Sequence, residues 1–225
     1  MTCSGNFTLE NGGTYYPGTG VQLFNGTGSK TLTGTMTIPT AEFQGNYQIV
    51  NGLTINTGLT LTSGNVTSAG NITLANGATI TRATGTLDAA PTFGTSVNVT
   101  YTGSTSVTTG FEIPTTASVL ANLTDNNTAT APAVTLGANT TVNGACSVGA
   151  GASLSVPANK TLELGSAGTM TVNASGLVAV QSNGTLKNSG AASDITTTAT
   201  TLTFAAGASY LHNPSSGVGT IPTAG

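Results

Sequence analysis

The chain has 225 residues, of which 5% are charged and 5% aromatic, with 31 glycines and no tryptophan. Four basic residues and a formal net charge of −3 leave little to neutralise phosphates, which argues against nucleic-acid binding. No stretch approaches the roughly 20 apolar residues of a membrane-spanning helix, so membrane insertion is not expected. So few large apolar residues favour a fold with a thin core of small aliphatic side chains.

The first part of the chain, 1–50, looks irregular and holds most of the large side chains. An open end of a repetitive β-fold exposes strand edges and core, so bulky residues near a terminus predict a capping region there. A loosely packed strand region without a capping role is the alternative. The large residues are Phe7, Tyr15, Tyr16, Phe24, Phe43 and Tyr47. The role of Cys3, and whether Met1 is the natural start, are left open.

From 51 to 90 short strands alternate with tight turns, at a looser spacing than further along the chain. Residues 91–133 break this rhythm and predict an irregular insertion or wider coils. After the regular repeat described next, a Thr-rich stretch from 195 to 211 again indicates strand. No stretch reads as a linker, so we expect a single domain over 1–225, with the repetitive fold covering 51–225.

The most regular part of the chain, 142–188, is an eight-residue repeat whose units we call the octads. Each octad has two apolar residues one residue apart, followed by four small or polar residues such as GAGA, PANK or NASG. Alternation within a pair is the period of a strand, whereas an eight-residue repeat cannot keep a helical stripe on one face. Each octad therefore predicts a very short strand followed by a tight corner.

Such a unit buries its apolar pair only when others stack above and below it, which predicts an all-β, parallel β-solenoid (β-helix). The inward residues form a predicted core ladder of Val148, Leu154, Val156, Leu162, Leu164, Met170, Val172, Val178 and Val180. Cys146 shares this pattern and is expected to be a buried thiol. The alternating residues Ser155, Glu163, Thr171 and Lys187 are expected to point outward.

Octads can close a coil after two sides or after three, which gives a two-octad or a three-octad coil. Glu163 and Lys187 are three octads apart, as are Asn159 and Asn183. A three-sided coil would place both pairs in register and bring opposite charges together. The spacing favours the three-octad coil and leaves the two-octad coil open.

Three runs resemble the repetitive regions of large secreted surface proteins of Bacteroidetes-type bacteria, in particular the cargo of type IX secretion. They are the run from Tyr101 to Thr115, the run from Leu120 to Asn127 and the run from Tyr210 to Ala224. The resemblance covers roughly 50–225. It implies an exported, adhesin-like or structural scaffold without catalytic residues. The chain departs from these proteins in being far shorter and in showing no recognisable sorting domain.

The sequence offers little for catalysis or for a cofactor. The seven acids are scattered singly, whereas β-helix enzymes that cleave polysaccharides gather several on one face. His212 is the only histidine, so no His-based metal or catalytic set is expected. We therefore expect no enzyme activity, no metal and no cofactor. Ice binding needs the same outward residue in every coil, and the octads mix Ser, Glu, Thr, Ala and Lys at that position.

The remaining expectation is a structural one: a subunit of an extracellular fibre or cell-surface scaffold or adhesin. Unpaired strand edges at the ends of a solenoid can meet another copy, so a head-to-tail homopolymer is the expected partner arrangement, by stacking or by a donated strand. The residues expected at these contacts are Phe7, Tyr15, Tyr16, Phe204, Tyr210 and Ile221. A passive carbohydrate-binding or ice-binding solenoid is the alternative, with surface glycans as a further candidate partner.

Overall fold

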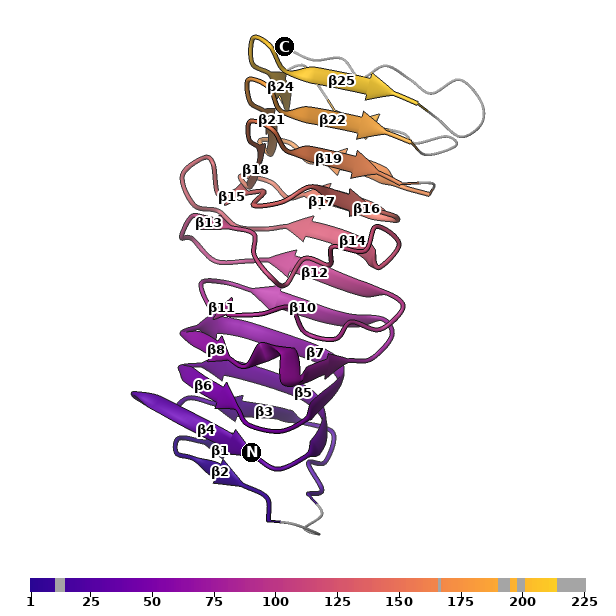
Figure 1. Ribbon diagram of the computed structural model, residues 1–225. Helices are drawn as coiled ribbons and strands as arrows, with labels where there is room; N and C mark the ends of the chain where they lie inside the picture. The colour runs from indigo at the N-terminus through magenta and orange to yellow at the C-terminus, as the bar shows by residue number, and fades with distance from the viewer. Residues whose placement is uncertain (11–14, 166, 190–194, 198–200, 214–225) are drawn as a thin grey trace. The chain divides into compact units, whose positions relative to one another are not determined.

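The computed structural model describes residues 1–10, 15–165, 167–189, 195–197 and 201–213. These residues form short parallel strands wound into an all-β solenoid, which confirms the fold predicted from the octads (Figure 1). A 3₁₀ turn at Ala69–Asn71 stands between two of the strands. The sequence predicts one domain, whereas the contacts within the chain group into two compact units, Met1–Val99 and Thr100–Gly225. Each unit is described by itself below.

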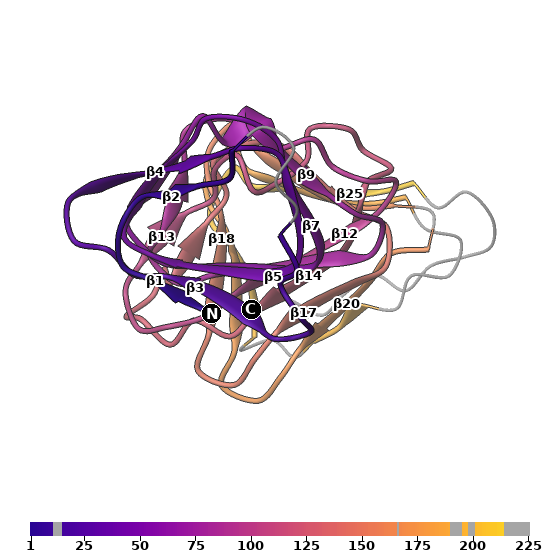
Figure 2. The same cartoon turned by 90° about the horizontal axis from the view of Figure 1, so that it is seen from below.

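Unit 1 winds two parallel sheets around one interior. Its strands are β1 (Thr2–Cys3), β2 (Phe7–Thr8), β3 (Val21–Phe24), β4 (Ser29–Thr33), β5 (Met36–Gln44), β6 (Asn46–Ile49), β7 (Leu53–Ser63), β8 (Asn65–Thr67), β9 (Ile72–Leu74), β10 (Ala78–Arg82) and β11 (Thr86–Leu87), and β12 (Val97–Tyr101) crosses into unit 2. One sheet has the order β1-β3-β5-β7-β10, with β9 also on β7, and the other β2-β4-β6-β8-β11. Seen from below, β2 and β4 lie on one side of the coil and β1, β3 and β5 along another (Figure 2).

The expectation of an irregular cap over 1–50 is wrong for 21–50, which forms coils of the solenoid with paired parallel strands. There β3 pairs with β5 and β4 pairs with β6, all in parallel. Phe24 and Phe43 are register partners, and their rings stack with centroids 4.9 Å apart. Tyr47 packs edge-on against Phe24, with a centroid distance of 5.5 Å, and all three side chains are buried. These aromatic rings fill the core because stacked coils put equivalent inward positions about one strand spacing apart.

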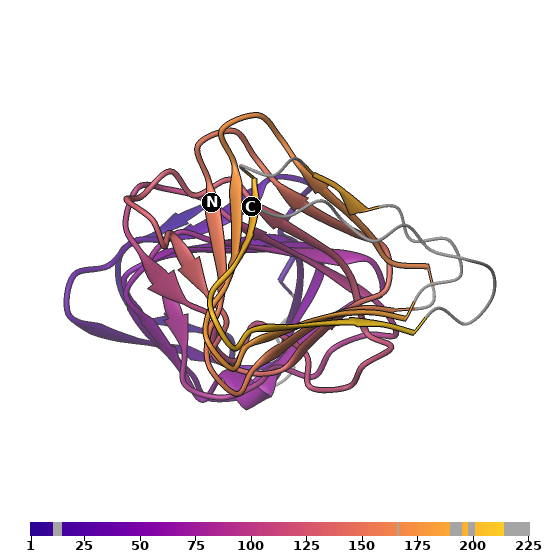
Figure 3. The same ribbon diagram turned by 90° about the horizontal axis from the view of Figure 1, so that it is seen from above.

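Unit 2 has three parallel sheets. Its strands are β13 (Val107–Thr108), β14 (Leu120–Asp125), β15 (Val134–Thr135), β16 (Thr140–Val142), β17 (Ala145–Val148), β18 (Ser153–Val156), β19 (Thr161–Leu164), β20 (Thr169–Val172), β21 (Leu177–Val180), β22 (Thr185–Asn188), β23 (Ile195–Thr196), β24 (Leu202–Phe204) and β25 (Ser209–His212). The sheet orders are β14-β17-β20-β23, β13-β15-β18-β21-β24 and β16-β19-β22-β25. Figure 3, viewed from above, shows the orange and yellow coils lying over one another.

The octads close after three sides, so the three-octad coil is confirmed and the two-octad coil is excluded. Cys146 lies opposite Met170, Leu154 opposite Val178 and Glu163 opposite Lys187. Asn159 and Asn183 also stack, because the backbone N–H of Asn159 donates to the carbonyl of Asn183 at 3.0 Å. By contrast, the coils of unit 1 between β3 and β11 vary in length.

The core ladder of the octads is buried, with all nine predicted side chains at most 7% exposed. Of the residues expected to point outward, Thr171 is exposed and Glu163 and Lys187 are half-buried. Ser155 differs, because it is only 3% exposed. It borders a small hollow of about 170 Å³ together with Ala131 and Pro132. The segment before β15 therefore covers a face that alternation alone assigns to solvent.

The corners between octads use left-handed backbone at stacked positions. Asn159, Ser175 and Asn183 have φ of 61°, 62° and 60°. This region costs most L-residues about 1–2 kcal/mol but is more accessible to Asn and Gly. Gly184 follows one such residue, and a Cβ there would lie 2.6 Å from the carbonyl oxygen of Val156. Close approach of the neighbouring coil thus requires glycine at this corner.

The expected insertion at 91–133 is narrower than predicted, since β12 and β14 lie within it as regular strands. After the short strand-free stretch 91–96, two irregular parts remain: 102–119, which contains only the two-residue β13, and 126–133. Glu112 fastens the first part, because its Oε1 accepts hydrogen bonds from Tyr101 Oη (2.7 Å) and the Gly110 N–H (2.9 Å). Asn127 fastens the second, because its Nδ2 donates to the carbonyl of Thr105 at 2.7 Å.

Candidate functional site

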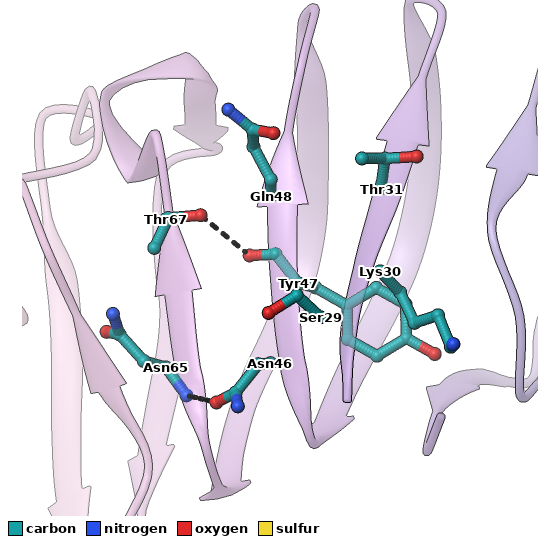
Figure 4. A pocket seen from close by; sticks show the side chains of 8 residues that line it. All are labelled: Ser29, Lys30, Thr31, Asn46, Tyr47, Gln48, Asn65 and Thr67. Atoms are coloured by element: carbon teal, nitrogen blue, oxygen red, sulfur yellow. Dashed lines mark hydrogen bonds between the residues drawn. The ribbon is translucent and has the colours of Figure 1, made fainter. Parts of the chain in front are cut away.

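A polar trough lies over three neighbouring strands of unit 1, β4, β6 and β8. It has a volume of about 460 Å³. Its lining residues are Ser29, Lys30, Thr31, Asn46, Tyr47, Gln48, Asn65 and Thr67 (Figure 4). Each of the three strands contributes a triplet, SKT, NYQ or NVT, whose first and third residues are polar. Alternation turns these two side chains of each strand to the same outward face.

The parallel register aligns these side chains into two rows. Ser29 pairs with Asn46, and Tyr47 with Val66, which places Asn46 beside Asn65 in the first row. Thr31, Gln48 and Thr67 form the second row, as Figure 4 shows. Neighbouring members of a row are one strand spacing apart, about 4.8 Å, so three strands span about 10 Å.

Part of the hydrogen-bonding capacity of the rows is used by the fold. Asn46 Oδ1 accepts from the backbone N–H of Asn65 at 2.8 Å, and Asn65 Oδ1 accepts from Thr86 Oγ1 at 2.9 Å. These bonds tie each coil to the next and fix the direction of both amides. Their Nδ2 groups remain available as donors, because a side-chain amide carries two N–H bonds besides its oxygen.

Thr67 Oγ1 also donates to the carbonyl of Tyr47, at 3.5 Å, whereas other lining side chains have unused hydrogen-bonding groups. Within the described residues the side chains of Ser29, Thr31 and Gln48 have no hydrogen-bond partner, and no carboxylate pairs with Lys30. Tyr47 is 1% exposed and forms part of the interior. Its hydroxyl donates to the carbonyl of Cys3 at 2.8 Å, and burial raises the pKa of this phenol. The trough therefore offers hydroxyls and amides, but no exposed aromatic ring, and Lys30 lies in register with Tyr47 on the inward-facing position of its strand.

A second hollow, of about 230 Å³, lies over β16, β19 and β22 in unit 2. Here Lys187 Nζ donates to Glu163 Oε1 at 2.8 Å. Partial burial alone would raise the pKa of Glu163, but the hydrogen bond and charge of Lys187 outweigh it and lower that pKa. The two charged groups bind each other, so this hollow has fewer unused hydrogen-bonding groups than the trough.

Five of the acids have structural partners. Glu42 Oε1 accepts from Thr62 Oγ1 and Gln44 Nε2, and Asp88 accepts from the backbone N–H groups of Ser68 and Ala69. Glu163 pairs with Lys187, and Glu112 and Asp125 are fully buried. Asp194 lies outside the described residues. No group of three or more His, Cys, Asp or Glu residues close enough to share a metal occurs in the described parts of the chain.

The environment of Asp125 perturbs the pKa of this carboxyl strongly. Burial raises this pKa to about 6, although the hydrogen bond from the Asn127 N–H to Oδ1 has the opposite effect and lowers it. Its Oδ2 is buried without a hydrogen-bond partner. Asp125 pairs with Val148 on β17, and the preceding inward residue of that strand is Cys146, a free thiol that is 1% exposed, as expected from the octads. Burial, with the charge of Asp125 second, raises the pKa of this thiol to about 12, so it is not a nucleophile.

The predicted contact residues lie at the first and last coils that the structure describes. Phe7 and Tyr15 pack edge to face at 5.4 Å, and Tyr16 is 86% exposed. Phe204 and Tyr210 have ring centroids 6.3 Å apart. Tyr210 Oη lies 3.2 Å from His212 Nδ1, so the single histidine has a structural neighbour. Ile221 lies outside the described residues.

Sequence reasoning missed the trough altogether. In the sequence, the trough corresponds to the polar first and third residues of the triplets 29–31, 46–48 and 65–67. These residues can be recognised as neighbours only when the coil lengths of unit 1 are known. Sequence reasoning also missed a column of outward threonines in register, Thr37, Thr54, Thr73 and Thr92. This column is only one residue wide. A second row in register contains Glu42, Thr60 and Thr81, and therefore includes a charged residue.

No protein-family model matches the sequence, and no curated protein or solved structure is significantly similar to it. Over the described residues no helix has the length and apolar character needed to cross a membrane.

Proposed function

We propose that the protein is a non-enzymatic structural subunit of an extracellular fibre or cell-surface scaffold, which assembles head-to-tail through its strand edges. The strands at both ends of the described chain carry this proposal. Within the described residues β1 and β2 each have one strand partner, as do β23, β24 and β25. The other side of each strand presents backbone N–H and C=O groups that a second copy can satisfy.

The chemistry of these edges supports a contact between copies. None of the five strands contains Lys, Arg, Asp or Glu, which are the residues that commonly keep edges apart. Exposed apolar side chains lie beside them: Met1 (48%), Tyr16 (86%) and Val21 (48%) near β1 and β3, and Leu211 (50%) on β25. An uncharged edge flanked by apolar side chains favours strand pairing with another chain.

The contact would join two different surfaces, the β1–β2 edge of one copy and the β23–β25 edge of the next. Such a heterologous contact propagates into a filament unless its rotation closes a ring. The structural partners of five acids, and the resemblance of the chain to secreted surface proteins, are in keeping with a scaffold role outside the cell.

Electron microscopy and sedimentation of the purified full chain test the proposal. We expect filaments or rings whose abundance rises with protein concentration, since each contact is an association between copies. A chain that stays monomeric at millimolar concentration would contradict head-to-tail assembly.

A further inference from the structure

The trough over β4, β6 and β8 differs from the other outward surfaces of the described chain. The hollow on β16, β19 and β22 contains an ion pair, and the face of β18 is covered by the segment around Pro132. The trough instead combines a volume of about 460 Å³ with side chains whose hydrogen-bonding groups are largely unused. That volume lies within the range of small-ligand sites, roughly 300–1,000 Å³.

We propose that this trough binds a segment of polysaccharide that runs along the solenoid axis, across the three strands. The two rows repeat their polar groups at every strand, and a sugar chain repeats hydroxyls along its length. Gln48 and the free Nδ2 groups of Asn46 and Asn65 donate to sugar oxygens, while Ser29 and Thr31 both donate and accept. Repetition on both partners allows several weak hydrogen bonds to form together.

Other ligand classes fit the trough less well. An apolar molecule would need an exposed apolar floor, yet Tyr47 is 1% exposed. A nucleic acid would need several cations, and Lys30 is the single cation in the lining. A peptide strand would pair with a sheet edge, whereas these side chains cover a sheet face. Hydroxyl-rich saccharides remain.

Isotope-edited NMR on the full chain tests the proposal through the side-chain amides of Asn46, Gln48 and Asn65. The probes are cellohexaose, mannohexaose and an alginate hexamer, each titrated into the millimolar range. At least one should cause saturable shifts of these three amides, whether or not the protein assembles. Absence of saturable shifts with all three probes would overturn the proposal.

A double variant, Thr31→Val with Gln48→Ala, gives the second readout. Neither side chain has a hydrogen-bond partner within the described residues, so the fold should be retained, which circular dichroism checks. Loss of two hydrogen bonds should weaken binding of the active probe roughly tenfold. The matched control is Thr73→Val, an exposed outward threonine on β9, which should leave affinity unchanged. Equal weakening in the control, or unchanged affinity in the double variant, would place binding elsewhere.

Discussion

Asp125 shows how one residue can make stability depend on pH in an unexpected direction. Its pKa is about 6 in the folded protein, against an ordinary value of 3.8, because the carboxylate is buried. At pH values between these two pKa values, the folded protein therefore keeps this proton, whereas the unfolded chain has released it. This contribution to the free energy of unfolding is fully present below about pH 4 and is lost as pH rises to about 6.

Asp125→Asn should remove this loss of stability at rising pH. The amide keeps an oxygen for the Asn127 N–H but carries no charge, so the variant should be more stable than the wild type at pH 7, by up to about 3 kcal/mol. At pH 3.5 the two proteins should differ little. Urea unfolding between pH 3.5 and 7.5 measures the difference, and two parallel pH profiles would contradict the assignment.

Leu164 represents the core ladder, because its side chain is 0% exposed and lies between neighbouring coils. Leu164→Ala should lower the free energy of unfolding by about 2–4 kcal/mol, through lost burial and a residual cavity. Leu211→Ala on β25 is the matched control, since Leu211 is 50% exposed. Denaturant titration at low protein concentration compares them, and equal losses would contradict the inward assignment of Leu164.

At the scale of an element, the octad corners are the most constrained parts of unit 2. Gly184→Ala places a methyl group 2.6 Å from the Val156 carbonyl oxygen, which belongs to the coil before it. Relief requires the two coils to shift, so we expect a loss of about 1–3 kcal/mol in the free energy of unfolding. Gly20→Ala is the control, because a Cβ there meets nothing within 4 Å. If both variants unfold alike, close coil packing is not what requires Gly184.

The stacking of β19 on β22 is also tested by the Glu163–Lys187 pair. Both side chains are partly exposed, at 25% and 31%, so solvent screens their attraction. A double-mutant cycle with Glu163→Gln and Lys187→Met should give a coupling energy of about 0.2–1 kcal/mol. Because the pKa of Glu163 is lowered, this coupling should be present above the ordinary carboxyl pKa and be lost as pH falls through the lowered value. A coupling unaffected by acid would contradict an ion pair.

For the whole molecule, assembly should depend on the uncharged carboxy-terminal edge. Leu211→Lys places a charge on β25 at an exposed outward position, where burial against another copy would desolvate it. We expect filaments to shorten or disappear while the circular dichroism of the β-structure is retained. Thr171→Lys, on the exposed face of the interior strand β20, is the control and should assemble normally. Loss of filaments in both variants would point to net charge rather than to the edge.

If both proposals hold, assembly would repeat the polar trough along a fibre. A trough that relies on hydrogen bonds, without aromatic stacking, is expected to bind one saccharide segment weakly. Many troughs on one filament would engage a long polysaccharide together and raise the overall avidity.

The sequence by itself determined the parallel solenoid, the core ladder of the octads and the burial of Cys146. This was possible because a strict eight-residue period repeats the same local pattern in every strand. Glu163 and Lys187 also pointed to the three-octad coil, since opposite charges at that separation meet only in a three-sided coil.

Only the tertiary structure decided what depends on contacts between coils of unequal length. The bulky residues within 21–50 predict a cap, and the repeat there is hidden because its spacing varies: Met36 pairs with Leu53, whereas Val21 pairs with Thr40, a longer step along the chain. The same variation conceals which polar residues share the trough. Alternation could not reveal that Ser155 is covered or that Asp125 is buried, because both result from irregular segments whose paths are set by long-range packing.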